Sequence, residues 1–180
     1  MGDDTVRQMR RFIVICAALG TLAVPAAALA MQAAPGDGSL VVKNASALSG
    51  TTVVALTVTG TVWGHVGFGK IVIDDSTPTD ESSPIVTGAG PSHASPYSDT
   101  ALSWSGANFK FRAVGGKYTI LISGSGVDVV AFGNGHVTLV GVPDSAAAGD
   151  GFYSLNGDPF RSLPGAPGKR LSIGTAVPIG

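Results

Sequence analysis

Four acidic side chains lie close together near the middle of the chain: Asp74, Asp75, Asp80 and Glu81. Paired carboxylates can bind Ca²⁺ through their oxygens, or serve as a general acid and a general base. Their spacing fits no calcium-binding loop, and aspartates beside Ser, Thr and Pro commonly form solvated turns. The cluster is a candidate metal site, with a solvated turn as the alternative.

Two tryptophans and two histidines are candidates for ligand binding. Trp63 and Trp104 could offer aromatic faces for stacking a sugar ring, although core packing is the commoner role of a tryptophan in a strand. His65 and His136 occupy similar places in two glycine-rich segments. The alternative for both is the solvent face of a strand, since a metal site needs further ligands and no cysteine lies near them.

A possible nucleophile lies in Gly90-Pro91-Ser92-His93. The hydrolase elbow requires Gly-x-Ser-x-Gly between a strand and a helix, and here Pro91 precedes the serine and no helix is predicted to follow. The glycine pairs of the chain also lack the helix that a phosphate-binding loop uses. The sequence therefore predicts no catalytic residue and no cofactor.

The N-terminus has the three parts of a secretory signal peptide. Arg7, Arg10 and Arg11 precede an apolar run that starts at Phe12, and the run ends in Ala28-Leu29-Ala30. We expect cleavage after Ala30 and a secreted or cell-envelope location. The alternative is an uncleaved membrane anchor, because the apolar stretch is nearly long enough to span a bilayer.

Charge and cysteine content limit the partners and the source of stability that can be expected for the mature chain, residues 31–180. The leader takes three of the 11 basic and two of the 12 acidic residues, which leaves a net charge of −2 with His neutral. Nucleic-acid binding is not expected, because it needs a basic stripe. The single cysteine, Cys16, is lost with the leader, so burial must stabilise the mature protein, which is long enough for one core.

The elements that must position these residues are strands. Val53–Thr59 alternates between two faces, and so does Phe109-Lys110-Phe111-Arg112, with aromatics on one side and charges on the other. Gly115-Gly116 favours a tight hairpin. No helical period is sustained after residue 30. We expect an all-β chain, a single-domain β-sandwich or small barrel over residues 39–175, with a linker at 31–38 and a tail at 176–180.

An internal repeat is visible within this domain. Val54–Ile73 and Tyr118–Leu139 each read as strand, Gly turn, short strand, Gly turn and strand when Gly60 is aligned with Gly124. The pattern favours two related halves.

Two further segments have distinct compositions. Residues 74–107 are rich in Pro and Ser and predict a long surface excursion with a brief strand at Ile85-Val86. Asn156-Gly157 stands between two short β runs and predicts an edge hairpin whose aromatics close one end of the core. Leu171-Ser172-Ile173 is expected to be the last strand.

The ending Tyr153-Ser154-Leu155-Asn156-Gly157, followed by Pro, an aromatic and Arg, resembles that of small exported β proteins of high-GC bacteria. The Phe-x-Phe-Arg strand and the Gly-Lys-Ile and Gly-His-Val strands share the resemblance, which implies a fold and no reaction. We expect an exported non-enzymatic protein of the envelope or extracellular space. The alternatives are a carrier of a small lipid or sugar and a small secreted hydrolase. A membrane span in the mature chain is not expected, and a homo-oligomer or an envelope partner is possible.

Overall fold

The computed structural model describes residues 36–43, 51–78, 83–88, 94–141 and 151–174, all within one compact unit, Gln32–Gly180. The strands are β1 (Gly38–Lys43), β2 (Thr52–Asp75), β3 (Ile85–Gly88), β4 (Ser95–Pro96), β5 (Ala101–Val140), β6 (Phe152–Leu155), β7 (Arg161–Ser162) and β8 (Lys169–Ile173). They form one antiparallel sheet, which confirms the all-β prediction. In the described part of the chain no helix could cross a membrane. The predicted leader, the tail and most of the linker lie outside the described residues.

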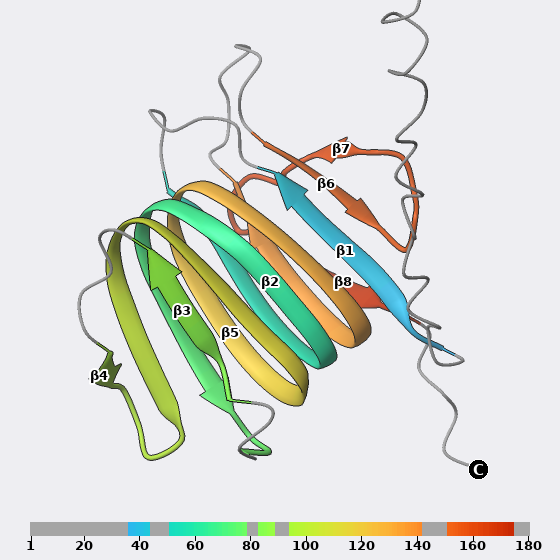
Figure 1. Ribbon diagram of the computed structural model, residues 1–180. Coiled ribbons are helices and arrows are strands. Elements are labelled where there is room, and N and C mark those ends of the chain that lie inside the picture. Colours follow the sequence, from blue (N-terminus) through green and yellow to red (C-terminus); the bar gives the residue numbers. More distant parts are fainter. Residues whose placement is uncertain (1–35, 44–50, 79–82, 89–93, 142–150, 175–180) are drawn as a thin grey trace, which may run out of the picture. The chain divides into compact units, whose positions relative to one another are not determined.

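β5 winds as a coil, and β2 lies between its successive turns (Figure 1). Leu56 of β2 pairs with Ile120 on one side and with Val137 on the other, and these two β5 residues are 17 positions apart. The chain therefore returns to the opposite edge of β2 after each turn. The sheet does not close into a barrel, so that alternative is wrong. The β-sandwich alternative stays a prediction, because both sides of the coil belong to one hydrogen-bonded sheet.

Apolar side chains fill the inside of the coil. Along the first half of β2, Val54, Leu56 and Val58 are buried and alternate with more exposed neighbours, as the two-residue period of a strand requires. The largest fully buried side chains are Tyr118, Phe109, Leu40, Leu56, Ile71, Ile73, Ile120, Ile122, Leu139 and Ile173. Burying each aliphatic side chain of this size contributes about 1.5–3 kcal/mol. Burial of these apolar side chains therefore stabilises the domain without disulfides.

Facing glycines mark the bends of the coil. Gly60 of β2 pairs with Gly133 of β5, and Gly69 pairs with Gly124. The φ angles of Gly60, Gly69 and Gly133 are 148°, 155° and 136°, which L side chains rarely adopt. Gly60 and Gly69 are nine residues apart, about half of one 17-residue turn. Glycine therefore lets the strands bend at each half-turn while their ladder of hydrogen bonds continues.

The predicted hairpin at Gly115-Gly116 does not form. Gly60 pairs with Gly116 and Thr61 pairs with Val114, so Gly115, at a φ of 73°, is an extra residue in a bulge. The two runs on either side belong to the same strand, β5. The prediction was wrong because a glycine pair allows a bend as well as a reversal, and the continuing ladder to β2 favours the bend.

The same bends account for the repeated pattern. Gly60 and Gly124, aligned in the two sequence segments, each pair with a different glycine, Gly133 and Gly69. The strand-Gly-strand-Gly order thus follows successive half-turns of the coil. The runs expected as separate strands before residue 74 are joined in β2. The internal duplication itself stays a prediction.

The excursion between β2 and β5 is shorter than expected. Asp74 and Asp75 end β2, and β5 begins at Ala101. The brief strand predicted at Ile85-Val86 is confirmed as β3, which pairs with residues 109–112 of β5. β4 pairs further along the same edge, so the excursion is partly hydrogen-bonded to the coil. Residues 79–82 and 89–93 lie outside the described part.

The predicted Asn156-Gly157 hairpin is confirmed. Asn156 and Gly157 have φ angles of 52° and 82°, and the Asp158 N–H donates to the Leu155 carbonyl over 2.9 Å. Two central residues with positive φ are the requirement of the tight turn that matches strand twist. β6 and β7 flank this turn, and β7 ends the strand order of the sheet, as an edge strand does.

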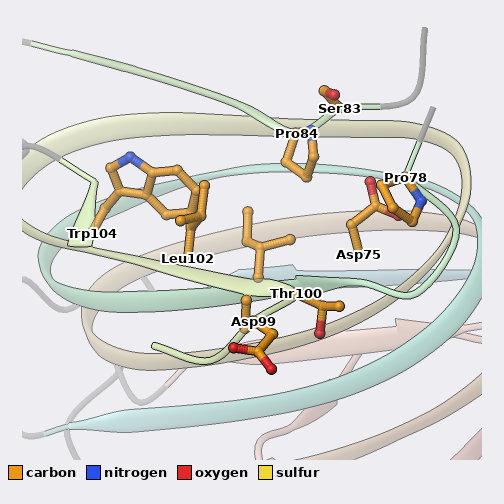
Figure 2. Close-up of a pocket in the computed structure, with 10 residues that line it drawn as sticks. Asp75, Pro78, Ser83, Pro84, Asp99, Thr100, Leu102 and Trp104 are labelled. Atoms are coloured by element: carbon orange, nitrogen blue, oxygen red, sulfur yellow. The ribbon is translucent and has the colours of Figure 1, made fainter. Parts of the chain in front are cut away.

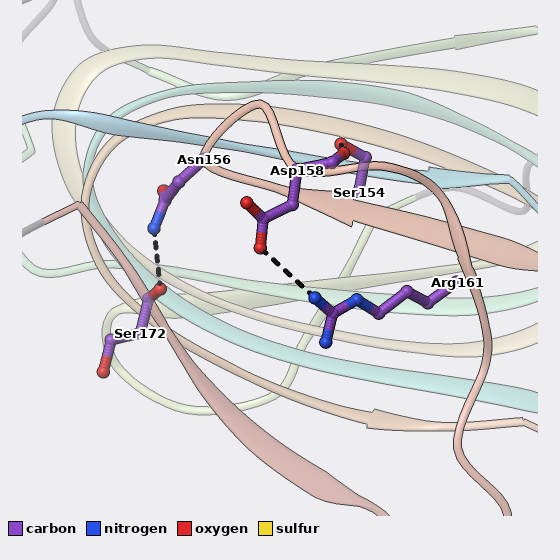
Figure 3. Close-up of polar contacts among 5 residues, drawn as sticks. All are labelled: Ser154, Asn156, Asp158, Arg161 and Ser172. Atoms are coloured by element: carbon purple, nitrogen blue, oxygen red, sulfur yellow. Dashed lines mark hydrogen bonds and ion pairs between the residues drawn. The ribbon is translucent and has the colours of Figure 1, made fainter.

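Asn156 also joins the hairpin to two other strands. Its Oδ1 accepts from the Ser39 N–H of β1 at 3.2 Å and from the Gly174 N–H, just after β8, at 3.0 Å. Its Nδ2 donates to the Ser172 carbonyl at 3.4 Å (Figure 3). One amide side chain therefore holds three segments that are far apart in the sequence.

The aromatics of the hairpin divide between core and surface. Tyr153 is buried in the core, whereas Phe152 and Phe160 are exposed. The expectation that these aromatics close one end of the core holds for Tyr153 alone. The predicted last strand is confirmed as β8, which pairs with residues 135–139 of β5.

Candidate functional site

A cavity of about 320 Å³ lies where β2 ends and β5 begins (Figure 2). Ile73 and Asp75 are two residues apart on β2, so they share the inward face of the strand. Leu102 pairs with Ile73, and Trp104 pairs with Ile71. The cavity is therefore continuous with the face that carries the core. Its lining is Ile73, Asp75, Pro78, Ser83, Pro84, Asp99, Thr100, Ala101, Leu102 and Trp104.

Asp75 is the most unusual residue of this lining. Only 6% of it is exposed, and its backbone N–H donates to the Thr100 carbonyl at 3.3 Å. Its Oδ1 accepts from the Thr77 N–H at 3.1 Å, a local turn typical of aspartate. Its Oδ2 is buried and has no hydrogen-bond partner among the described residues, and the same holds for Oδ1 of the neighbouring Asp74. An unsatisfied buried acceptor of this kind is costly and calls for an explanation such as an ordered water or a bound donor.

The other walls are apolar, with one more carboxylate. Trp104 is half-buried and packs against the core. Pro78 and Pro84 lie across the cavity from the turn that holds Asp99 and Thr100 (Figure 2). Among the described lining residues, the only side chains that ionise are two carboxylates, and none is basic. The cavity thus combines an aromatic wall with local negative charge.

The predicted acidic cluster is only partly assembled. Asp74 and Asp75 are neighbours on β2, so their side chains point to opposite faces of the sheet, and only Asp75 lines the cavity. Asp80 and Glu81 lie outside the described residues. No group of three or more potential metal-ligating His, Cys, Asp or Glu side chains occurs in the part of the chain that the structure describes.

The two tryptophans do not form one platform. Trp63 is 38% exposed on the outer face of β2 and stacks on Phe132, with 5.5 Å between ring centroids and 27° between ring planes. Trp104 lines the cavity on the inner face of β5. Sequence alone could not separate them, because the face that each residue takes depends on the bends between them.

The candidate histidines lie on different parts of the sheet. His65 pairs with Lys110 and Asp128, whereas His136 pairs with Thr57 and Ser172. Thr57 and His65 are eight residues apart on β2, about half a turn of the coil, so the two imidazoles do not share a site. Ser92 and His93 lie outside the described residues.

The excursion at residues 74–107 is the place where the sequence favours a ligand contact, but of the residues that line the cavity only Asp75 and Trp104 were candidates. The segment predicted to be a surface excursion supplies five of the lining residues: Pro78, Ser83, Pro84, Asp99 and Thr100. One signal was present: Leu102 and Trp104 alternate with the small residues Ala101 and Ser103, the pattern of a strand with one bulky face. A second hollow, of about 40 Å³ near the β6–β7 hairpin, is too small for an organic ligand.

The chain matches no protein-family model, and no curated protein or solved structure is detectably similar to it. The resemblance to small exported β proteins therefore stays a prediction.

Proposed function

We propose that this chain is an exported, non-enzymatic β domain that binds a small organic ligand. The observation that carries the proposal is the cavity at the end of the coil, where Trp104 forms one wall and the buried Asp75 carboxylate has an unsatisfied oxygen. Small-molecule sites are mostly apolar cavities with a few well-placed polar groups, and the volume of about 320 Å³ lies at the lower end of their range.

The polar groups of the cavity favour binding over covalent catalysis. Ser83 and Thr100 supply hydroxyls, and Asp75 and Asp99 supply carboxylates. A nucleophilic serine or threonine needs an adjacent base such as His or Lys, and none lines the described cavity. A hydrolase with a serine or threonine nucleophile therefore has less support than a binding role.

The export half of the proposal is supported by the sequence. Three arginines, an apolar run and a small-residue end precede the domain in the order that a secretory leader has. Exported proteins fold in an oxidising environment, where cysteines form disulfides. A packed interior that contains no cysteine is compatible with that environment.

A screen of small molecules against the ¹⁵N-labelled full chain tests the binding role. Amines, sugars, organic acids and fatty acids would be added in turn while amide and indole shifts are followed by NMR. We expect one class to shift Leu102 and the Trp104 indole in a saturable way. Trp104→Ala should abolish the shifts, and the matched control Trp63→Ala should leave them intact.

Two results would count against this function. Shifts that never include the cavity residues would remove the binding site. Turnover of a bound compound that Asp75→Asn abolishes would replace the binding role with an enzymatic one.

A further inference from the structure

We propose that the cavity binds the ammonium group of a small primary amine. This inference rests on the proposed function and specifies the chemistry of its ligand.

Charge is the first argument for an ammonium group. Asp75 and Asp99 contribute two carboxylates to the lining, and no Lys, Arg or His is among its described residues. The Asp75 carboxylate is nine-tenths buried, where charges interact more strongly than they do in water. A cation gains from this environment, whereas an anion would be repelled by both carboxylates.

Hydrogen bonding is the second argument, and it distinguishes an ammonium group that carries N–H bonds from a quaternary one. Among the described residues, Oδ2 of Asp75 is a buried acceptor without a donor, while Oδ1 accepts a hydrogen bond from the Thr77 N–H. Asp75 lines the cavity, and because the χ2 torsion of an aspartate is broad, a partial rotation brings Oδ2 toward it at the expense of the Thr77 bond. An ammonium N–H satisfies such an oxygen with a charge-assisted bond, which a quaternary ammonium group cannot make.

The walls provide the third argument. The indole of Trp104 attracts cations over its face, and Pro78 and Pro84 provide apolar surface for an alkyl chain (Figure 2). A bare divalent metal ion fits less well. Ca²⁺ takes six to eight oxygen ligands, and the described residues offer no group of three or more acidic or metal-ligating side chains.

The test uses Trp104 as a reporter in the full chain. The chain has two tryptophans, so Trp63→Phe leaves Trp104 as the only source of indole fluorescence. Four compounds would be titrated at constant ionic strength: n-pentylammonium, pentyltrimethylammonium, 1-pentanol and Ca²⁺. We expect saturable binding of n-pentylammonium that is about tenfold or more tighter than that of the alcohol or the quaternary cation.

Variants locate the effect. Asp75→Asn keeps an acceptor for the Thr77 N–H and removes the charge. It should weaken the binding of n-pentylammonium by about tenfold or more. Asp99→Asn, at the rim, should weaken the binding of n-pentylammonium several-fold. This variant provides the test if Asp75→Asn does not fold. Asp128→Asn removes a carboxylate from the outer face of β5 and should leave affinity unchanged.

The outcomes separate this inference from the proposed function. The amine proposal would be overturned if 1-pentanol bound as tightly as n-pentylammonium, or if Asp75→Asn and Asp99→Asn both bound n-pentylammonium as tightly as the unsubstituted chain. Either result would still leave a ligand-binding cavity. Preference for Ca²⁺ would also overturn the amine proposal. If none of the four compounds binds in the titration, the amine proposal is overturned. If the wider NMR screen also detects no binding, the proposed function fails as well.

Discussion

Gly60 of β2 lies directly opposite Gly133 of β5, and neither position has room for a side chain. A Cβ on Gly60 would collide with the Phe132 carbonyl oxygen, and a Cβ on Gly133 would collide with the Thr59 carbonyl oxygen. The pair brings two backbones together at a bend of the coil. This reciprocal contact gives the most direct test of the fold.

Replacing either glycine by alanine should destabilise the domain strongly. Gly60→Ala and Gly133→Ala combine an unfavourable φ with a collision against backbone that cannot move freely, so we expect a loss of about 2–4 kcal/mol in the free energy of unfolding. Urea denaturation measures it. The control is Gly115→Ala, where φ is 73° and no atom of the described residues lies within 4 Å of the added Cβ. Its cost should be about 1 kcal/mol. Equal losses of stability in all three variants would argue against the close approach of the two backbones at Gly60 and Gly133.

Neighbouring residues of β5 should respond very differently to truncation. Ile120 is fully buried inside the coil, whereas Leu121 is 41% exposed on the outer face. Ile120→Ala should cost about 3 kcal/mol through the cavity it leaves, and Leu121→Ala less than about 1 kcal/mol. Thermal and chemical denaturation measure both. The reverse order would mean that β5 turns its other face to the core.

Loss of the Asn156 side chain should loosen three segments together. Asn156→Ala removes its bonds to Ser39, Gly174 and Ser172, with an expected cost of about 2 kcal/mol. Hydrogen exchange should accelerate at the Ser39 and Gly174 amides.

Asp158→Ala is the matched control for Asn156→Ala. It breaks a 3.6 Å ion pair with Arg161 between two side chains that are more than half exposed (Figure 3). Such pairs are worth less than about 0.5–1 kcal/mol. Unchanged exchange at Ser39 and Gly174 in Asn156→Ala would contradict the role given to this amide.

Export should leave a defined N-terminus. When the full chain is expressed in a bacterium with a C-terminal tag, the mass of the secreted product should correspond to a start at Met31. Replacing Ala30 by a bulky residue such as Phe should block processing, because the cleavage site requires small residues. Recovery of uncleaved chain in the membrane fraction would support the anchor alternative instead.

The strand content of the fold was predictable, and its path was not. The period-two alternation of Val54, Leu56 and Val58 indicates a strand with one buried face, and Asn156-Gly157 specifies its turn by chemistry alone. Gly115-Gly116 was misread because a sequence carries no sign of whether glycines reverse a strand or bend it. That choice depends on hydrogen bonds to β2 residues that lie more than 50 positions earlier in the sequence.

The candidate site was partly predictable for a similar reason. Asp75 and Trp104 were named from their side-chain chemistry, and both line the cavity. Asp74 and Trp63 were named on the same grounds and point elsewhere, because one residue of strand or one glycine bend changes the face. The prolines and Thr100 carry no chemical signal, so only the folded path places them at the cavity.

The coil imposes an order of events on a newly made chain. β2 is synthesised before β5, yet both of its edges are completed by β5, whose second pass ends at Val140. Until that residue has emerged, β2 is an apolar strand with an unpaired edge, the kind of segment that associates with other chains. Because most of its pairings are distant in the sequence, folding should be slow. A chain of this design gains from being held unfolded until its synthesis is complete.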